Sequence, residues 1–257
     1  MQYEDASRDF WRYLSVRTVE RLGLQPGERV LDVPCGTGHS LLVAAHAVGP
    51  AGLVVGLDVA PRMLAIAREK VDAAGLANVD IQLGDMTAIR RPEDPYDAVI
   101  CVLGLFFADD MPTLARSFVD LVRPEGGRVA VTVFGEHFVD PLREVFVRAV
   151  HEVARGLDVV QPWGRTADMA SLRRVFDGAG AGALTIDTED DSTPLPTGDD
   201  WWRVVMGSGL RATVTALGPE LAAAVRARGD ARIAREGIDH VVTRSRYAVF
   251  ERRPSFP

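Results

Sequence analysis

The sequence predicts an α/β protein built on a doubly wound, mostly parallel sheet of seven strands, with helical insertions in its C-terminal half. Two observations carry this prediction. Short apolar runs alternate with helical patterns along residues 1–134. These runs lack a polar alternation, which is typical of strands whose two faces are both covered by helices.

Composition excludes several other classes of protein. A chain of 257 residues can bury a core that needs no disulfide or metal, and 47% hydrophobic with 25% charged residues excludes a disordered chain. The net charge of −7 gives no reason to expect nucleic acid as a partner, and no apolar run reaches membrane-spanning length. Two cysteines, Cys35 and Cys101, make no disulfide framework and indicate a reducing, cytoplasmic setting.

The first half of the chain predicts helices and strands in strict alternation. Residues 1–25 form the first helix, because Phe10, Leu14 and Leu22 recur at near-helical spacing ahead of Pro26. Apolar runs then predict strands at 30–33, 53–57, 79–83, 96–103 and 128–134.

Three helices are predicted between those strands. The first covers 41–48. The second has Pro61 in its first turn and Gly75 past its end, as helix termini prefer. The third covers 114–122 and is stopped by Pro124.

Beyond Gly135 the alternation loosens, which predicts helical insertions. Residues 190–200, with two prolines and a glycine, are predicted to be a mobile connection. The tail shares the sheet if its two strands pair with each other. Helices are predicted at 139–156, 167–179, 199–210 and 219–236, and the two strands at 183–188 and 241–252.

The turn after the first strand is the most informative segment, with the sequence Asp32-Val33-Pro34-Cys35-Gly36-Thr37-Gly38. Its glycines let the backbone approach a ligand closely, and the helix that follows offers unpaired N–H groups. In a doubly wound sheet such a turn lies at the carboxyl edge of the strands, where ligands bind. We expect Asp32 to place its carboxylate on an ammonium group of the ligand.

Acidic residues also follow the second and third strands. A carboxylate at Asp58 can accept both hydroxyls of a ribose, and one at Asp85 can accept an exocyclic amine of adenine. Each residue alone is equally explained as a helix cap or turn residue. A dinucleotide is the main alternative ligand, but Leu41 replaces the third glycine of its phosphate fingerprint, and Asp32 would face the phosphates. The pattern favours a nucleoside with a cationic, amino-acid-like end.

These segments resemble the motifs of class I S-adenosylmethionine-dependent methyltransferases. Within that class they are most similar to the small-molecule methyltransferases of the ubiquinone and menaquinone biosynthesis type. The resemblance covers about residues 28–134, through the turn described above and the segments 56–64, 84–86, 95–101 and 121–128. It implies a Rossmann-like fold, S-adenosylmethionine as cofactor, and in-line methyl transfer to an oxygen, nitrogen or carbon of a small organic acceptor. Pro34 departs from the family pattern, which often has glycine or alanine there.

The resemblance also implies roles for individual residues and segments. One domain would span 1–257, with a helical lid over 1–25, a cofactor-binding core over 28–134, and substrate-side helices and final strands over 135–257. The residues expected to border the methionine end, ribose and adenine, or to form a wall after the fourth strand, are Asp32, Pro34, Cys35, Gly36, Gly38, Asp58, Val59, Met63, Asp85, Met86, Cys101, Val102 and Leu103.

Further side chains are candidates for acceptor binding or catalysis. A general base is needed only if the acceptor keeps its proton, and His137 and His151 are the candidates. His39 could lie near the carboxylate of the cofactor. No histidine or cysteine spacing fits a metal site. The side chains expected to bind an apolar or aromatic acceptor are Phe106, Phe107, Trp11, Trp201, Trp202 and Arg203. On the first helix, Tyr3, Phe10 and Tyr13 would form a lid together with Trp11. Core packing explains the aromatic side chains equally well, and exposure to solvent explains the arginine.

Two other functions are compatible with the residues. A non-methylating enzyme, such as a cyclase, would keep the same cofactor rim. A nicotinamide-dependent oxidoreductase on the same kind of sheet is less favoured, because the third glycine is missing. The sequence predicts neither the identity of the acceptor nor the oligomeric state.

Overall fold

The computed structural model describes residues 8–159, 161–177, 179, 182–195 and 198–252. In the first half the elements are α2 (Arg8–Leu22), β1 (Arg29–Asp32), α3 (His39–Val48), β2 (Leu53–Asp58), α4 (Pro61–Ala73), β3 (Val79–Leu83), η1 (Met86–Ala88), β4 (Ala98–Val102), η2 (Leu105–Phe107), α5 (Met111–Leu121) and β5 (Arg128–Phe134). In the second half they are α6 (Leu142–Val153), η3 (Pro162–Thr166), α7 (Met169–Phe176), β6 (Ala183–Pro194), α8 (Gly198–Met206), α9 (Arg211–Glu236) and β7 (His240–Glu251).

The seven strands form one sheet in the order β3-β2-β1-β4-β5-β7-β6. The pairings of β1 with β2 and β4, of β2 with β3, and of β4 with β5 are all parallel. The predicted fold class, a mostly parallel, doubly wound sheet, is therefore confirmed. The two last strands are neighbours, so the tail belongs to the same sheet, as the sequence predicted.

The described chain divides into two compact units. The sheet unit contains residues 11–133, 165–187 and 246–252, and the helical unit contains residues 8–10, 134–164 and 188–245. The strands β6 and β7 each have residues in both units. A single domain over the whole chain, with residues 1–25 as its lid, stays a prediction.

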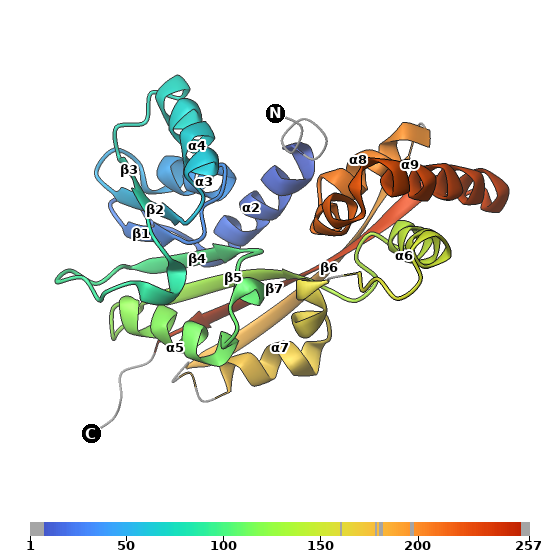
Figure 1. Cartoon of the computed structure of the whole chain (residues 1–257). Coiled ribbons are helices and arrows are strands. Elements are labelled where there is room, and N and C mark those ends of the chain that lie inside the picture. The colour runs from blue at the N-terminus through green and yellow to red at the C-terminus, as the bar shows by residue number, and fades with distance from the viewer. Residues whose placement is uncertain (1–7, 160, 178, 180–181, 196–197, 253–257) are drawn as a thin grey trace. The chain divides into compact units, whose positions relative to one another are not determined.

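Helices cover both faces of the strands in the sheet unit. Figure 1 shows α2, α3 and α4 on one side of β1 to β5, and α5 and α7 on the other. On the first side, Leu41 and Val48 of α3 pack with Val30, Val54 and Ile100 of the strands, all fully buried. Burial of this kind stabilises a fold by about 25 cal/mol for each Å² of apolar surface removed from water.

Local sequence explains where several of these helices begin. Pro61 occupies the first turn of α4, where its missing N–H costs nothing. The Asp110 carboxylate accepts the N–H of Thr113 at 3.0 Å and caps α5. Likewise, the Asp168 carboxylate accepts the N–H of Ser171 at 2.8 Å and caps α7.

The structure corrects one expectation in the second half. Strand β6 continues to Pro194 and α8 begins at Gly198, so most of the predicted mobile connection at 190–200 is strand or helix. The acidic part of β6 is stable as a strand because its negative charge is paired. The Asp190 carboxylate accepts two hydrogen bonds from the Arg244 guanidinium of the neighbouring β7, at 2.5 and 2.7 Å. Helix α9 consists of two helices joined at a kink, because Gly218 adopts a φ of 74° and a ψ of 171°, which are not helical. The second helix begins at Pro219, where the sequence predicted it, and the first, from Arg211, was not predicted.

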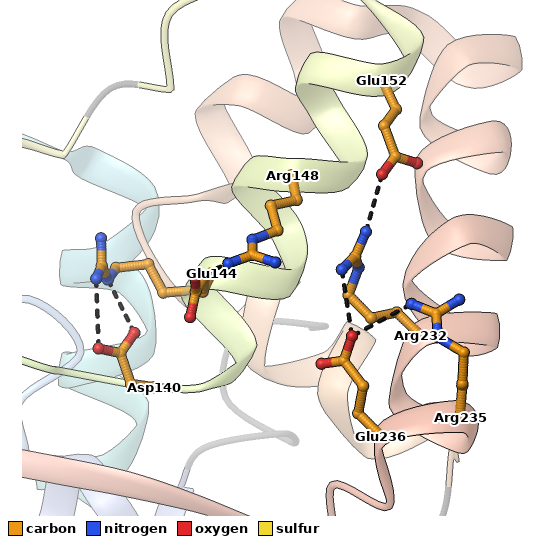
Figure 2. Close-up of polar contacts among 8 residues, drawn as sticks. Asp140, Glu144, Arg148, Glu152, Arg232, Arg235 and Glu236 are labelled. Carbon is orange, nitrogen blue, oxygen red and sulfur yellow. Dashed lines mark hydrogen bonds and ion pairs between the residues drawn. The ribbon is translucent and has the colours of Figure 1, made fainter.

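The helical unit is held partly by ion pairs between its helices. Figure 2 shows Arg232 of α9 between two carboxylates, Glu152 of α6 at 2.9 Å and Glu236 at 3.2 Å. Trp201 of α8 packs on Gly229 of α9, where an added Cβ would lie 2.3 Å from its ring. Among the described residues, no helix combines the length and apolarity that crossing a membrane requires.

Candidate functional site

The turn after β1 is tied to the end of β2. Since β1 lies between β2 and β4, their carboxyl ends meet at one edge of the sheet. The N–H of Cys35 donates to the carbonyl of Leu57 at 2.9 Å, and the N–H of Gly36 donates to Oδ2 of Asp58 at 2.9 Å. The first two predicted motifs therefore form one hydrogen-bonded assembly.

Two glycines give this turn its shape. Gly36 and Gly38 have φ values of 52° and 85°, a region that other residues rarely adopt. A Cβ on Gly38 would lie 3.1 Å from Cβ of Ala67, so this glycine also lets α3 approach α4. A Cβ on Gly36 would meet open space, so this part of the turn is accessible to a ligand.

Asp58 is oriented by two backbone groups. Its Oδ2 accepts the Gly36 N–H and its Oδ1 accepts the Ala60 N–H, at 2.9 and 2.8 Å. The residue is buried, with 7% of its surface exposed. Each carboxylate oxygen has a second lone pair, so both can still accept a hydroxyl such as those of a ribose.

Asp32 lies at the end of β1, as the sequence predicted, but its carboxylate is buried. The residue is fully buried, and its Oδ2 accepts the hydroxyl of Ser40 at 2.8 Å while Oδ1 has no hydrogen-bond partner. Burial raises the pKa of Asp32 to about 7, and the nearby Asp58 charge adds to the increase. Because no part of the side chain is exposed, a ligand on the surface of the turn does not touch it in this conformation.

The residues expected at the adenine are on the surface. Asp85 caps η1, where Oδ1 accepts both the N–H and the hydroxyl of Thr87 at 2.8 Å, and these bonds lower the pKa of the carboxyl. The large apolar side chains of Val59 and Leu83 are 68% and 63% exposed beside the ends of β2 and β3. Asp85 therefore follows a strand end that exposes apolar surface. The other two residues expected at the adenine, Met63 and Met86, are half-buried.

The two cysteines are packing residues rather than exposed ligands. Cys35 and Cys101 are free and buried, and burial raises the pKa of both thiols, that of Cys101 to about 12. Both stay neutral at physiological pH. Only their backbone is therefore available to a bound cofactor. In the predicted wall, Val102 is half-buried, and Leu103 is buried with a φ of 56°.

The predicted acceptor residues have different environments. Phe107 is 63% exposed, and its ring lies 4.9 Å from that of the buried Phe106. Trp201 is 1% exposed, and its indole N–H donates to Asp230 at 2.6 Å, so its contacts are those of a core residue. Trp202 is half-buried, and the centroid of its ring lies 6.5 Å from that of Phe146. Arg203 is exposed and forms an ion pair with Asp200 at 3.0 Å. Trp11 is half-buried.

The histidine candidates lie on exposed surface. His137 Nδ1 lies 3.1 Å from Oδ2 of Asp140, and the residue adopts a φ of 62°. His151 is exposed in the last turn of α6. His39 begins α3 and its Nε2 lies 3.3 Å from Nζ of Lys70. Tyr3 lies outside the described residues.

Sequence reasoning missed two residues of this region. Ser40 binds the carboxylate of Asp32 from the first turn of α3, and nothing in the sequence distinguishes it from an ordinary helix residue. Gly104 lies against Pro34, where an added Cβ would come 2.1 Å from the proline Cδ. A glycine directly after the fourth strand was the available indication of a close backbone approach.

The arrangement fits an adenosine. Asp58 retains acceptor capacity for two hydroxyls, Gly36 faces open space, and Val59 offers exposed apolar surface for a flat base. No group of three or more potential metal ligands occurs among the residues that the structure describes.

Known proteins are similar to the chain in the same region. Residues 30–126 match the family of the methyltransferase domain. Nocamycin O-methyltransferase of Saccharothrix syringae is 33% identical over 130 residues, which are 51% of this chain and 46% of that protein. Demethylmenaquinone methyltransferase of Geobacillus sp. (strain WCH70) is 38% identical over 122 residues, 47% of this chain and 52% of that protein. The chain thus spans about half the length of the curated relatives it matches.

A solved structure extends the similarity of fold over most of the chain. Phosphoethanolamine N-methyltransferase 2 of Haemonchus contortus, in complex with phosphomonomethylethanolamine and S-adenosylhomocysteine, superposes with a TM-score of 0.57. The match covers 94% of this chain and 52% of that one, at 16% identity. At this identity the likeness concerns the fold alone.

Proposed function

We propose that this chain, whose residues 30–126 form a class I S-adenosylmethionine-dependent methyltransferase domain, transfers the methyl group of that cofactor to a small organic acceptor. The observation that carries the proposal is the assembly of Gly36 with Asp58, in which the oriented carboxylate keeps two acceptor sites beside an open glycine turn. Two relatives named for nocamycin and demethylmenaquinone support a small-molecule acceptor. The cytoplasmic setting indicated by the two free cysteines belongs to the same proposal.

The protein's part in this reaction is mainly binding and orientation. When bound, the sulfonium of S-adenosylmethionine supplies an already activated methyl group. Asp58 would hold the ribose hydroxyls, and the backbone of Gly36 would lie along the methionine end. Fixing the cofactor in this way lowers the entropic cost of in-line attack by the acceptor.

We infer that the acceptor is apolar or aromatic. Phe107 supports this, because a large aromatic side chain is 63% exposed only five residues after β4 and its neighbour Phe106 is buried against it. Aromatic and apolar side chains line most small-molecule pockets.

Calorimetric titration with S-adenosylhomocysteine tests the cofactor site. We expect the wild-type chain to bind and Asp58→Asn to bind about tenfold more weakly or worse, because the substitution removes the charge and turns one acceptor into a donor facing a backbone N–H. Asp72→Asn, at an exposed aspartate of α4, is the matched control and should bind like the wild type. A wild-type protein that binds no S-adenosylhomocysteine would refute the proposal.

Activity assays separate methyl transfer from the other functions considered. With methyl-labelled S-adenosylmethionine and a panel of phenols and quinols, we expect label in at least one product, and a several-fold higher KM for Phe107→Ala than for Phe107→Leu. Cofactor binding without any transfer of label would favour a non-methylating enzyme. Saturable NADH binding by fluorescence would favour an oxidoreductase.

A further inference from the structure

Gly104 is a glycine because of space, not because of its backbone conformation. Its φ of −104° and ψ of −33° are accessible to any residue. An ideal Cβ, however, would lie 2.1 Å from Cδ and 2.5 Å from Cγ of Pro34, and 3.1 Å from Sγ of Cys101. The backbone that follows β4 therefore packs directly on the proline ring of the turn after β1.

The turn side of this contact has little freedom to move. The proline ring is rigid and fixes its own φ. The next two residues, Cys35 and Gly36, donate their N–H groups to Leu57 and Asp58 at 2.9 Å. A displacement of Pro34 is therefore transmitted to the hydrogen bond that orients the Asp58 carboxylate.

The loop side is anchored as well. The N–H of Leu103 donates to the carbonyl of Thr132 at 2.8 Å. Further along, the guanidinium of Arg165 donates to the carbonyls of Ala108 at 2.9 Å and Asp109 at 2.7 Å. Because the loop is held at both ends, a side chain at position 104 would have to push Pro34.

We infer that Gly104 is a positioning residue for the cofactor site, and that its missing side chain is what allows a proline at position 34. The pair sets where the glycine turn lies relative to the end of β2, so it controls cofactor affinity without touching the reacting atoms. This inference rests on the function proposed above. It also explains how Pro34, which departs from the family pattern, is accommodated, because Gly104 leaves room for the proline ring.

A double-mutant cycle tests the inference, with calorimetric titration of S-adenosylhomocysteine and thermal unfolding for each protein. Gly104→Ala should weaken binding about tenfold, because the added Cβ pushes Pro34 and so displaces the turn that orients Asp58. Alanine at position 34 lacks the Cγ and Cδ atoms that collide, so Pro34→Ala/Gly104→Ala should bind within about threefold of Pro34→Ala alone. Gly164→Ala is the control, because a Cβ there meets open space at an ordinary φ, and it should bind like the wild type.

The outcomes separate the inference from the proposed function. If the wild type fails to bind S-adenosylhomocysteine, the proposed function and this inference both fall. If the wild type binds and Gly104→Ala binds equally well, or shows only a lower melting temperature, the inference alone is overturned. Should Gly104→Ala fail to fold, the comparison of Pro34→Ala with the double variant decides, and a large further loss of binding in the double variant contradicts the pairing.

Discussion

At the residue scale, Asp32 is a buried carboxyl group of the sheet unit. A carboxylate with one unpartnered oxygen and no exposed surface is costly to ionise, which is why its pKa rises to about 7. The hydroxyl of Ser40 compensates only in part. Asp32 bonds Ser40 of α3, whereas Asp58 bonds the backbone of the glycine turn at Gly36.

The raised pKa of Asp32 predicts a pH-dependent stability. The folded protein binds this proton more tightly than the unfolded chain, whose carboxyl has a pKa near 3.8, so the contribution is complete below that value and is lost as pH rises through 7. In chemical denaturation, the free energy of unfolding of the wild type should fall relative to Asp32→Asn between about pH 4 and 7 and level off above that range, with a slope of at most about 1.4 kcal/mol per pH unit.

The control for this measurement is Asp72→Asn, which should follow the wild type at every pH. If Asp32→Asn and the wild type change in parallel over the same range, Asp32 has no raised pKa in the folded protein.

At the element scale, the helical unit depends on how α9 binds its neighbours. Arg232 is the least exposed of the charged side chains in Figure 2, at 17%, and it joins Glu152 of α6 to Glu236 at the end of α9. Arg235 also contacts Glu236 but is 63% exposed. Screening by solvent makes the second pair weaker than the first.

The two arginines therefore form a matched pair of variants. Arg232→Ala should lower the free energy of unfolding by about 1 kcal/mol, and Arg235→Ala by less than about 0.5 kcal/mol. Urea denaturation followed by circular dichroism measures both. An equal effect of the two substitutions would show that the bridge between α6 and α9 adds nothing to stability.

At the scale of the whole molecule, sequence patterns predicted the sheet well because β1, β2, β4 and β5 are mostly buried. The bounds of β5 were predicted to the residue, since its apolar run ends where the chain leaves the core, and those of β3 were predicted equally well although none of its residues is buried. The patterns failed where contacts distant in sequence decide, as for the acidic end of β6, which Arg244 stabilises. For the site, a motif gave the position of Asp32 but not its burial, and it gave Pro34 but not the space supplied by Gly104.

The structure of the protein soaked with S-adenosylhomocysteine tests the central claim most directly. We predict the ligand at the carboxyl edge of β1 and β2, with its ribose hydroxyls within hydrogen-bond distance of Asp58 and its methionine end along Gly36. Crystals that take up no ligand under saturating conditions, or a ligand seated away from Asp58, would contradict the account.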